Sequence, residues 1–592
     1  MPRLPRPLAL LFALAAALLS QAALLPEAAA QGVMADTPMR PVTRTVAVTN
    51  ARVVVAPGRV LERATVVVRD GRIEAVGPRV AVPPDADVIA GDSLWVYAGF
   101  VDAFAYAGVP RPPESPNEPF RGDPGAPPPD RAGLTPELDV RTLLAYDEAA
   151  FKALRDLGFA AAHVAPRTGA LAGQGAVVLL RAPARAADGR LETARDLALA
   201  GPGTLVAQMQ TARGVYPGTP MGVLAVFRER VENARRYRAA GAAFARDPAR
   251  AERPRFDPAL EAFGPTLDGN RPLVFRADGY ADGFRVLRAT EDAGLPVILA
   301  GVADATPLVA RLRARRAAVF APLTLPDTVA ADSAARAVVI PPAPSAGGVS
   351  FISPRRTTSY RDLPAETAAL TAQRREAVRR AEAAPAALAA AGVPFAFATL
   401  EARPADVRRN LRRMIAAGLS PEAALGALTT EPARLLGLER QLGTVEAGKV
   451  GNLVLTTGDY FAENTRVRYV LVEGVRYAAE SAAASRPDRN GDGRTGAAAP
   501  DVTGVWDFVV QTPIGEQRGT FTIGGRPGAL TGSSEFGGQT LRFDAVEFDG
   551  TTLTLRAQGR ATSGTVSGDT FTGSADLGPA GVFPLTATRR PG

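Results

Sequence analysis

The stretch EAAFKALRDLGFAAAHV, residues 148–164, places a helical pattern, a glycine and a buried strand in direct succession. Gly158 suits the end of a helix, and the apolar run that follows it suits a strand covered on both faces. The same order returns over 282–299 and again before the strand expected at 394–398. Repeated helix, glycine and strand units predict a parallel sheet, and over residues 99–442 they favour a (β/α)8 TIM-like barrel. A doubly wound open sheet is the alternative.

Segments of β character flank this α/β region. β-Branched runs fill residues 46–98, and strand and turn patterns return over 443–477. Residues 479–501 are rich in Ala, Ser, Gly, Asp and Arg, which is typical of a linker. Residues 502–592 hold short alternating strands joined by glycine-rich turns. They predict a separate antiparallel β-barrel or sandwich at the C-terminus.

The N-terminal 30 residues have the pattern of a secretory signal peptide. Two arginines precede the apolar stretch Leu8–Leu19, and Ala28–Ala30 offers a small-residue cleavage site. No later segment is apolar for long enough to span a bilayer. We therefore expect an exported protein, periplasmic or extracellular, with no transmembrane segment once the signal is removed.

Composition narrows the class of partner. The formal net charge is +8, but the arginines alternate with acidic residues, as over 374–382. This pattern is typical of a solvated helix face, so we expect no nucleic-acid partner. The chain has no cysteine and one histidine, His163. The expected partner is a small molecule or an envelope component, neither of which the sequence identifies.

Two motifs carry a resemblance to a known family. Residues 99–106, GFVDAFAY, lie where that family has glycine, two apolar residues, aspartate and then His-x-His. Residues 418–425, GLSPEAAL, are followed by GTVEAGK at 443–449. The chain resembles the amidohydrolase superfamily, and within it the exported imidazolonepropionase-like members. The resemblance covers roughly residues 46–477.

The resemblance implies a fold and a chemistry. Members build a small β-sandwich from both flanks of the barrel, so residues 46–98 are expected to pack with 443–477. They hydrolyse C–N bonds other than peptide bonds with zinc or a similar divalent metal. Their reaction centre lies at the C-terminal ends of the barrel strands.

This chain departs from the family at the metal-ligand positions. Phe104 and Tyr106 replace the two histidines after the first strand, and Arg276 stands where a further histidine is expected. Phenylalanine has no lone pair, the phenol is a poor ligand at neutral pH, and a guanidinium repels a cation. Near Thr399 the expected aspartate is missing. Phe104, Tyr106, Arg276 and Thr399, with the neighbouring Asp278, form the candidate pocket, for which we expect no metal and no cofactor.

Other side chains are weaker candidates for metal binding. His163 lies within an apolar strand, where a hydrogen-bonded core histidine is expected. Carboxylates alone would suit Mg²⁺ or Ca²⁺ rather than zinc, and several lie near predicted strand ends: Asp102, Asp278, Asp282, Asp304 and Glu401. Asp102 is expected to be structural. The turn Asp488–Gly493 matches the opening of a calcium loop but lacks the acidic residue at position twelve, so whether it binds calcium stays open.

These observations support three functional hypotheses. The first is an amidohydrolase-like barrel that has lost its metal centre and now binds a ligand or a partner. The second is an active C–N hydrolase with an unconventional carboxylate site or a metal-free mechanism. The third places the function in the C-terminal β domain, as a binder of envelope polymer or of a hydrophobic ligand. The catalytic residues, if there are any, are not identified by the sequence.

Overall fold

A computed structural model describes most of the chain and divides it into two compact units, Met1–Ser485 and Arg486–Gly592. The described residues are 45–112, 120–185, 189–326, 363–479, 502–512, 515–526, 529–536, 539–548, 552–557, 560–576 and 582–590. The predicted signal peptide, most of the predicted linker and the Asp488–Gly493 turn lie outside these ranges. Among the described residues, no helix is long and apolar enough to cross a membrane.

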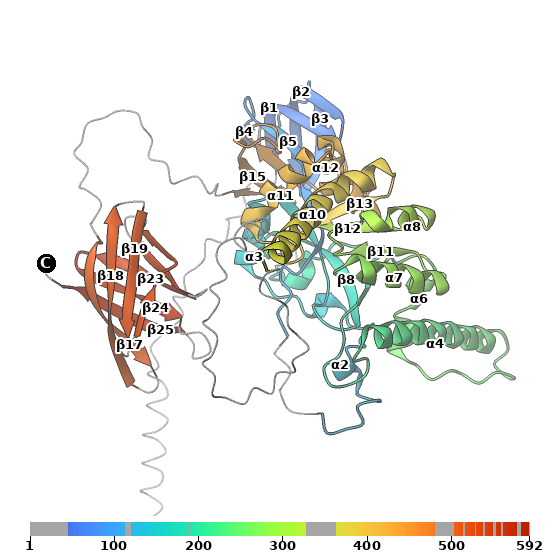
Figure 1. Cartoon of the computed structure of the whole chain (residues 1–592). Helices are drawn as coiled ribbons and strands as arrows, with labels where there is room; N and C mark the ends of the chain where they lie inside the picture. The colour runs from blue at the N-terminus through green and yellow to red at the C-terminus, as the bar shows by residue number, and fades with distance from the viewer. Residues whose placement is uncertain are drawn as a thin grey trace, which may run out of the picture. The chain divides into compact units, whose positions relative to one another are not determined.

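The first unit is built on an eight-stranded barrel, as predicted (Figure 1). Its sheet runs from β6 to β13 in chain order, and it closes where Ala105 pairs in parallel with Leu400. The Leu400 amide donates to the Phe104 carbonyl at 2.9 Å across this seam. The strands are β6 (Phe100–Ala105), β7 (Phe159–Val164), β8 (Leu171–Leu179), β9 (Thr204–Gln208), β10 (Leu273–Arg276), β11 (Val297–Ala300), β12 (Ala318–Pro322) and β13 (Phe395–Ala398).

The expectation of a wholly parallel sheet is wrong at one strand. β8 runs antiparallel to both of its neighbours, β7 and β9, while the other seven strands run in one direction. Only residues 165–170 connect β7 to β8. A parallel crossover needs a dozen or more residues, so a connection this short can only reverse the chain.

Except around β8, helices stand between successive barrel strands and cover them from outside (Figure 1). Their ends follow the sequence: Asp147 caps α3 by accepting from the Ala150 amide, and Ser420 caps α12 by accepting from the Ala423 amide at 3.1 Å. The longer helices are α3 (Glu148–Arg155), α4 (Pro220–Arg246), α7 (Tyr280–Asp292), α8 (Val309–Ala314), α10 (Leu363–Ala390), α11 (Pro404–Ala416), α12 (Pro421–Leu428) and α13 (Thr430–Leu435). Short turns of helix are α2 (Pro129–Ala132), α5 (Pro258–Glu261) and α6 (Gly264–Leu267).

The segments on either side of the barrel form one continuous sheet. β5 pairs in parallel with β1 on one side and antiparallel with β14 on the other, which joins the two flanks. The side chains facing its core are mainly valine, leucine and isoleucine. The order is β16-β15-β14-β5-β1-β2-β3, with β4 beside β1, over β1 (Thr45–Ala56), β2 (Arg59–Arg69), β3 (Arg72–Gly77), β4 (Asp87–Ala90), β5 (Trp95–Ala98), β14 (Leu453–Thr456), β15 (Val467–Val472) and β16 (Val475–Ala478).

The second unit is an antiparallel β-barrel, as predicted. Eight of its strands form a closed ring, because β18 pairs with both β17 and β19. β20 pairs with β19. The strands are β17 (Gly504–Thr512), β18 (Gly515–Arg526), β19 (Ala529–Phe536), β20 (Gln539–Arg542), β21 (Ala545–Phe548), β22 (Thr552–Ala557), β23 (Arg560–Ser567), β24 (Thr570–Asp576) and β25 (Val582–Arg589).

Candidate functional site

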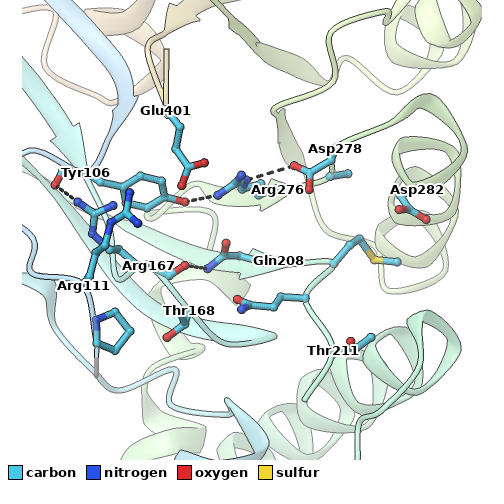
Figure 2. A pocket seen from close by; sticks show the side chains of 14 residues that line it. Tyr106, Arg111, Arg167, Thr168, Gln208, Thr211, Arg276, Asp278, Asp282 and Glu401 are labelled. Atoms are coloured by element: carbon cyan, nitrogen blue, oxygen red, sulfur yellow. Dashed lines mark hydrogen bonds and ion pairs between the residues drawn. The ribbon is translucent and has the colours of Figure 1, made fainter. Parts of the chain in front are cut away.

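A polar cavity of about 620 Å³ opens at the C-terminal ends of the first unit's barrel strands (Figure 2). Tyr106 follows β6, Arg167 follows β7 and Glu401 follows β13, while Gln208 and Arg276 end β9 and β10. Side chains from strands far apart in the sequence therefore converge, as the barrel topology requires. The remaining lining residues are Arg111, Pro112, Thr168, Met209, Gln210, Thr211, Ala277, Asp278 and Asp282.

The residues at two of the family's metal-ligand positions, Tyr106 and Arg276, are hydrogen-bonded to each other. Arg276 Nη1 donates to the Tyr106 hydroxyl at 2.6 Å, and Arg276 Nε donates to an Asp278 carboxylate oxygen at 3.3 Å (Figure 2). Tyr106 is buried, and burial raises the pKa of its phenol although Arg276 opposes the rise. The phenol therefore stays protonated at neutral pH. Tyr106 and Arg276 form a neutral acceptor and a fixed cation at the cavity wall.

A second guanidinium is held beside the same tyrosine by backbone oxygens. Arg167 donates from Nε to the Val109 carbonyl at 2.7 Å and from Nη2 to the Tyr106 carbonyl at 3.0 Å. Its guanidinium carbon lies 4.7 Å from the centre of the Tyr106 ring. Burial, and after it the charge of Arg111, lowers the pKa of Arg167. The cavity thus holds two neighbouring arginines whose charges repel each other.

Asp102, Phe104 and Thr399 lie behind this wall and do not line the cavity. Asp102 Oδ1 accepts from the Thr399 amide at 3.0 Å and from the Phe104 amide at 3.1 Å, and its Oδ2 accepts from the Thr399 hydroxyl. The Phe104 ring is fully buried and packs against Tyr106. Of the five predicted pocket residues, the structure brings Tyr106, Arg276 and Asp278 to the cavity.

His163 is a core side chain with both ring nitrogens engaged. Nδ1 donates to the Ala103 carbonyl at 2.8 Å, so Nε2 accepts from the Thr204 hydroxyl, also at 2.8 Å. The ring is fully buried between Phe104 and Phe320, and burial lowers its pKa to about 4. At neutral pH it is an uncharged link between β6, β7 and β9.

Gly175 on β8 leaves the space that this histidine needs. A Cβ at that position would lie 2.5 Å from His163 Nε2 and 2.5 Å from Thr204 Oγ1. We expect Gly175→Ala to lower the free energy of unfolding by about 1–3 kcal/mol, because the ring and the hydroxyl must move apart. Denaturant unfolding measures this change, with Gly241→Ala as control because a Cβ there meets no atom within 4 Å. Equal stability of the two variants would contradict this packing.

The residues at the ligand positions do not fit a zinc-type ion. Phe104 offers no lone pair, Tyr106 keeps its proton, Arg276 is a cation, and His163 has no free nitrogen. Asp278, Asp282 and Glu401 do line the cavity. In the part of the chain that the structure describes, however, no three His, Asp or Glu side chains gather closely enough to hold a metal ion.

The sequence did not reveal every residue of the site. Glu401 was noted only as an acid near a strand end, and Arg111, Arg167 and Gln208 were not predicted. Arg167 follows strand β7 by three residues, a position at which polar side chains reach this end of a barrel. That signal was present in the sequence. The strand ending at Gln208 was not predicted, so its side chain had no place in the expected site.

Comparison with known proteins agrees with the fold and with the motif at residues 418–449. A model of the amidohydrolase family matches residues 351–477. The C-terminal part of the barrel and the flanking sheet is therefore similar in sequence to the amidohydrolase family. No curated protein matches it. The narrower likeness to imidazolonepropionase-like members stays a prediction.

One solved structure shares the fold over most of the chain, and two others are more distantly similar. A crystal structure of an amidohydrolase from Thermotoga maritima MSB8 is 20% identical, covers 73% of this chain and 99% of its own, and has a TM-score of 0.54. A prolidase complexed with n-methylphosphonate-l-proline is 17% identical, with coverages of 74% and 100% and a TM-score of 0.42. A Xaa-Pro dipeptidase with bound methionine is 15% identical, with coverages of 73% and 100% and a TM-score of 0.39.

Proposed function

We propose that this amidohydrolase superfamily member binds a small acidic molecule in its strand-end cavity and has lost the family's metal-dependent hydrolysis. One observation carries the proposal: the Arg276 guanidinium is hydrogen-bonded to Tyr106, so two ligand positions are occupied by a cation and its acceptor. A fixed cation at the strand ends disfavours a metal ion and favours an anion. Export and the chemical identity of the natural ligand stay predictions.

The arginines leave donors for a ligand. The hydrogen bonds of Arg276 to the described residues use Nε and Nη1, and those of Arg167 use Nε and Nη2. Arg111 also lines the cavity and repels Arg167. A carboxylate or phosphate between them would accept charge-assisted hydrogen bonds and relieve this repulsion. The cavity is therefore suited to one acidic group on the arginine side.

The opposite wall limits the size and charge of the ligand. Asp278 and Asp282 line the side of the cavity away from Arg111 and Arg167 (Figure 2). Asp282 is itself paired with Arg285 at 2.5 Å. Glu401 lies on the arginine side, where its charge affects the pKa values of Tyr106, Arg167 and Arg276 (Figure 2). A polyanion would meet all three carboxylates, whereas a molecule with a single acidic end would meet only Glu401, whose charge the three arginines of the cavity outweigh. We infer that the ligand is small and carries its negative charge at one end.

A titration of the full chain with three probes tests the proposal. Inorganic phosphate, succinate and N-acetylglycine each offer an acidic group, and isothermal titration calorimetry measures their affinity. Arg111→Met is expected to weaken the best probe about tenfold, because an exposed charge-assisted hydrogen bond is lost. Arg213→Met is the matched control, since Arg213 is exposed and outside the cavity lining.

Two results would count against this function. Equal affinity in both variants, or no heat with any probe, would contradict anion binding at this wall. Release of acetate from N-acetylglycine by the untreated chain would instead support the second hypothesis, an active hydrolase. In that case Asp278, Asp282 and Glu401 are the carboxylates to substitute first, because they line the cavity.

A further inference from the structure

The second unit contains a cavity inside its own closed barrel. Its volume is about 200 Å³. Eight of the nine strands, all except β21, contribute lining residues, and Phe543 completes the lining. Its walls include Phe508, Phe521 and Phe536, whose rings stack at 6.1 and 6.3 Å around Phe508. Eight-stranded barrels are just wide enough to hold one small ligand. The size of the void therefore admits a molecule rather than only water.

The cavity lining is uncharged and mostly apolar. None of the lining side chains is charged, and the polar ones are Gln517, Ser534 and Thr562. An engineered apolar cavity of about 150 Å³ is known to bind benzene, so a void of this volume and character suits a molecule of similar or slightly larger size. The stacked phenylalanines favour an aromatic guest, because offset and edge-on ring contacts add to burial.

The cavity has an entrance marked by exposed apolar side chains. Phe536 is 46% exposed and Leu541 is 37% exposed, although both line the cavity. Phe536 lies on β19, a strand of the closed ring, and Leu541 lies on β20, which pairs with β19 outside the ring. The neighbouring part of the interior is filled, because Trp506, Leu553 and Phe571 are fully buried. The barrel therefore contains both packed side chains and an open pocket, which meet at Phe521.

We propose that the C-terminal barrel binds a small neutral aromatic molecule in this pocket, with Phe508, Phe521 and Phe536 as its walls. This site is separate from the strand-end cavity of the first unit, and its chemistry is the opposite: apolar and uncharged instead of polar and rich in arginine. The hypothesis of a ligand-binding C-terminal domain thereby gains a location and a ligand class. Binding here does not depend on the acidic ligand proposed above.

A fluorescence titration of the full chain tests this pocket. Trp506 stacks on Phe521 at 5.9 Å, so it lies one ring behind the cavity wall. The chain has two tryptophans, and Trp95→Phe leaves Trp506 as the only one. p-Nitrotoluene, a neutral aromatic quencher, is expected to quench Trp506 in a saturable way. The 4-nitrobenzoate anion, of similar size, is expected to show at least about tenfold weaker quenching, because its charge cannot be solvated in the pocket.

Paired variants on β22 separate pocket binding from general quenching. Ala557 lines the cavity and Arg556 points outward on the same strand. Ala557→Phe is expected to weaken p-nitrotoluene binding about tenfold or more by filling the void, while Arg556→Phe keeps it within about twofold. Ser534→Leu fills the cavity from β19 and replaces Ala557→Phe if that variant fails to fold. Linear quenching that is the same in filling and outward variants, or equal quenching by the anion, overturns the proposal.

Discussion

Asp102→Ala is expected to lower the free energy of unfolding of the first unit by about 3–5 kcal/mol. The carboxylate accepts three hydrogen bonds that join the end of β6 to the residue after β13, and it is fully buried. Its removal leaves the Thr399 and Phe104 amides without acceptors at the seam that closes the barrel. Urea unfolding followed by helical circular dichroism measures the change, because the helices belong to this unit.

Asp102→Asn is the matched variant and is expected to behave differently. Its amide oxygen can accept from the two backbone amides, and its NH₂ group can donate to the Thr399 hydroxyl. The variant is therefore expected to stay within about 1 kcal/mol of the parent protein near pH 6. A stability of Asp102→Ala close to that of Asp102→Asn would contradict a structural role for this carboxylate.

The difference in stability between Asp102→Asn and the parent protein is expected to depend on pH. Burial raises the pKa of Asp102 to about 7, so the folded state binds a proton that the unfolded state releases near pH 4. The stability that protonated Asp102 contributes is fully present below the pKa of the unfolded state, and it is lost as the pH rises to 7 and above. Relative to the parent, Asp102→Asn should gain on the order of 2–4 kcal/mol between pH 4 and 8. A constant difference across this range would contradict the raised pKa.

His163 acts in the opposite direction over part of the same range. Burial lowers its pKa to about 4, so the unfolded state takes up a proton near pH 6.5 and the folded state does not. The stability it contributes is present above pH 6.5 and falls as the pH drops toward 4. In the parent protein the stability due to Asp102 falls as the pH rises, while that due to His163 increases, so the two pH dependences partly cancel. In Asp102→Asn the loss of stability on acidification due to His163 should become visible.

Arg276→Met is expected to weaken the best acidic probe of the strand-end cavity by about tenfold to a hundredfold. Arg276 is more enclosed than Arg111, with 22% of its side chain exposed, and its hydrogen bonds to Tyr106 and Asp278 hold it in one position. Losing a charge-assisted hydrogen bond from a partly buried cation costs about 1.5–3 kcal/mol. Calorimetric titration of the full chain measures the change.

Tyr106→Phe tells whether the guanidinium or the phenol binds the ligand. It removes only the hydroxyl that accepts from Arg276 and keeps the ring under Arg167. We expect an effect of only a few fold, because the cation remains. A loss as large as that of Arg276→Met would assign the binding to the phenol, and an unchanged affinity in Arg276→Met would contradict the proposed site.

The local elements of the barrel could be predicted because their sequence patterns are complete. The strand Phe159–Val164 and the helix before it agree with the prediction. The reversed strand β8 could not be predicted by repeating helix and strand units, since its direction is set by a six-residue connection. Gly175, which leaves room for His163, reflects packing between strands, and one sequence does not show such packing.

The candidate site was predictable at the positions that the family motif marks. Tyr106 and Arg276 were expected near each other, and the structure shows a direct hydrogen bond between them. The position of Phe104 and Thr399 behind the wall depends on which way each side chain points at a strand end, and the motif does not specify that. Arg167 and Gln208 could be placed only from the barrel's strand order, because Arg167 follows and Gln208 ends a strand that the family motif does not mark.

The proposed loss of the metal centre is tested most directly by one measurement of zinc binding. Untagged full-length chain is incubated with excess zinc chloride and dialysed, and the zinc that remains bound is measured by elemental analysis. Because Phe104, Tyr106 and Arg276 replace the nitrogen ligands, we predict that no stoichiometric zinc is retained. One or two equivalents of tightly held zinc, lost in a variant lacking Asp278 or Glu401, would contradict the account.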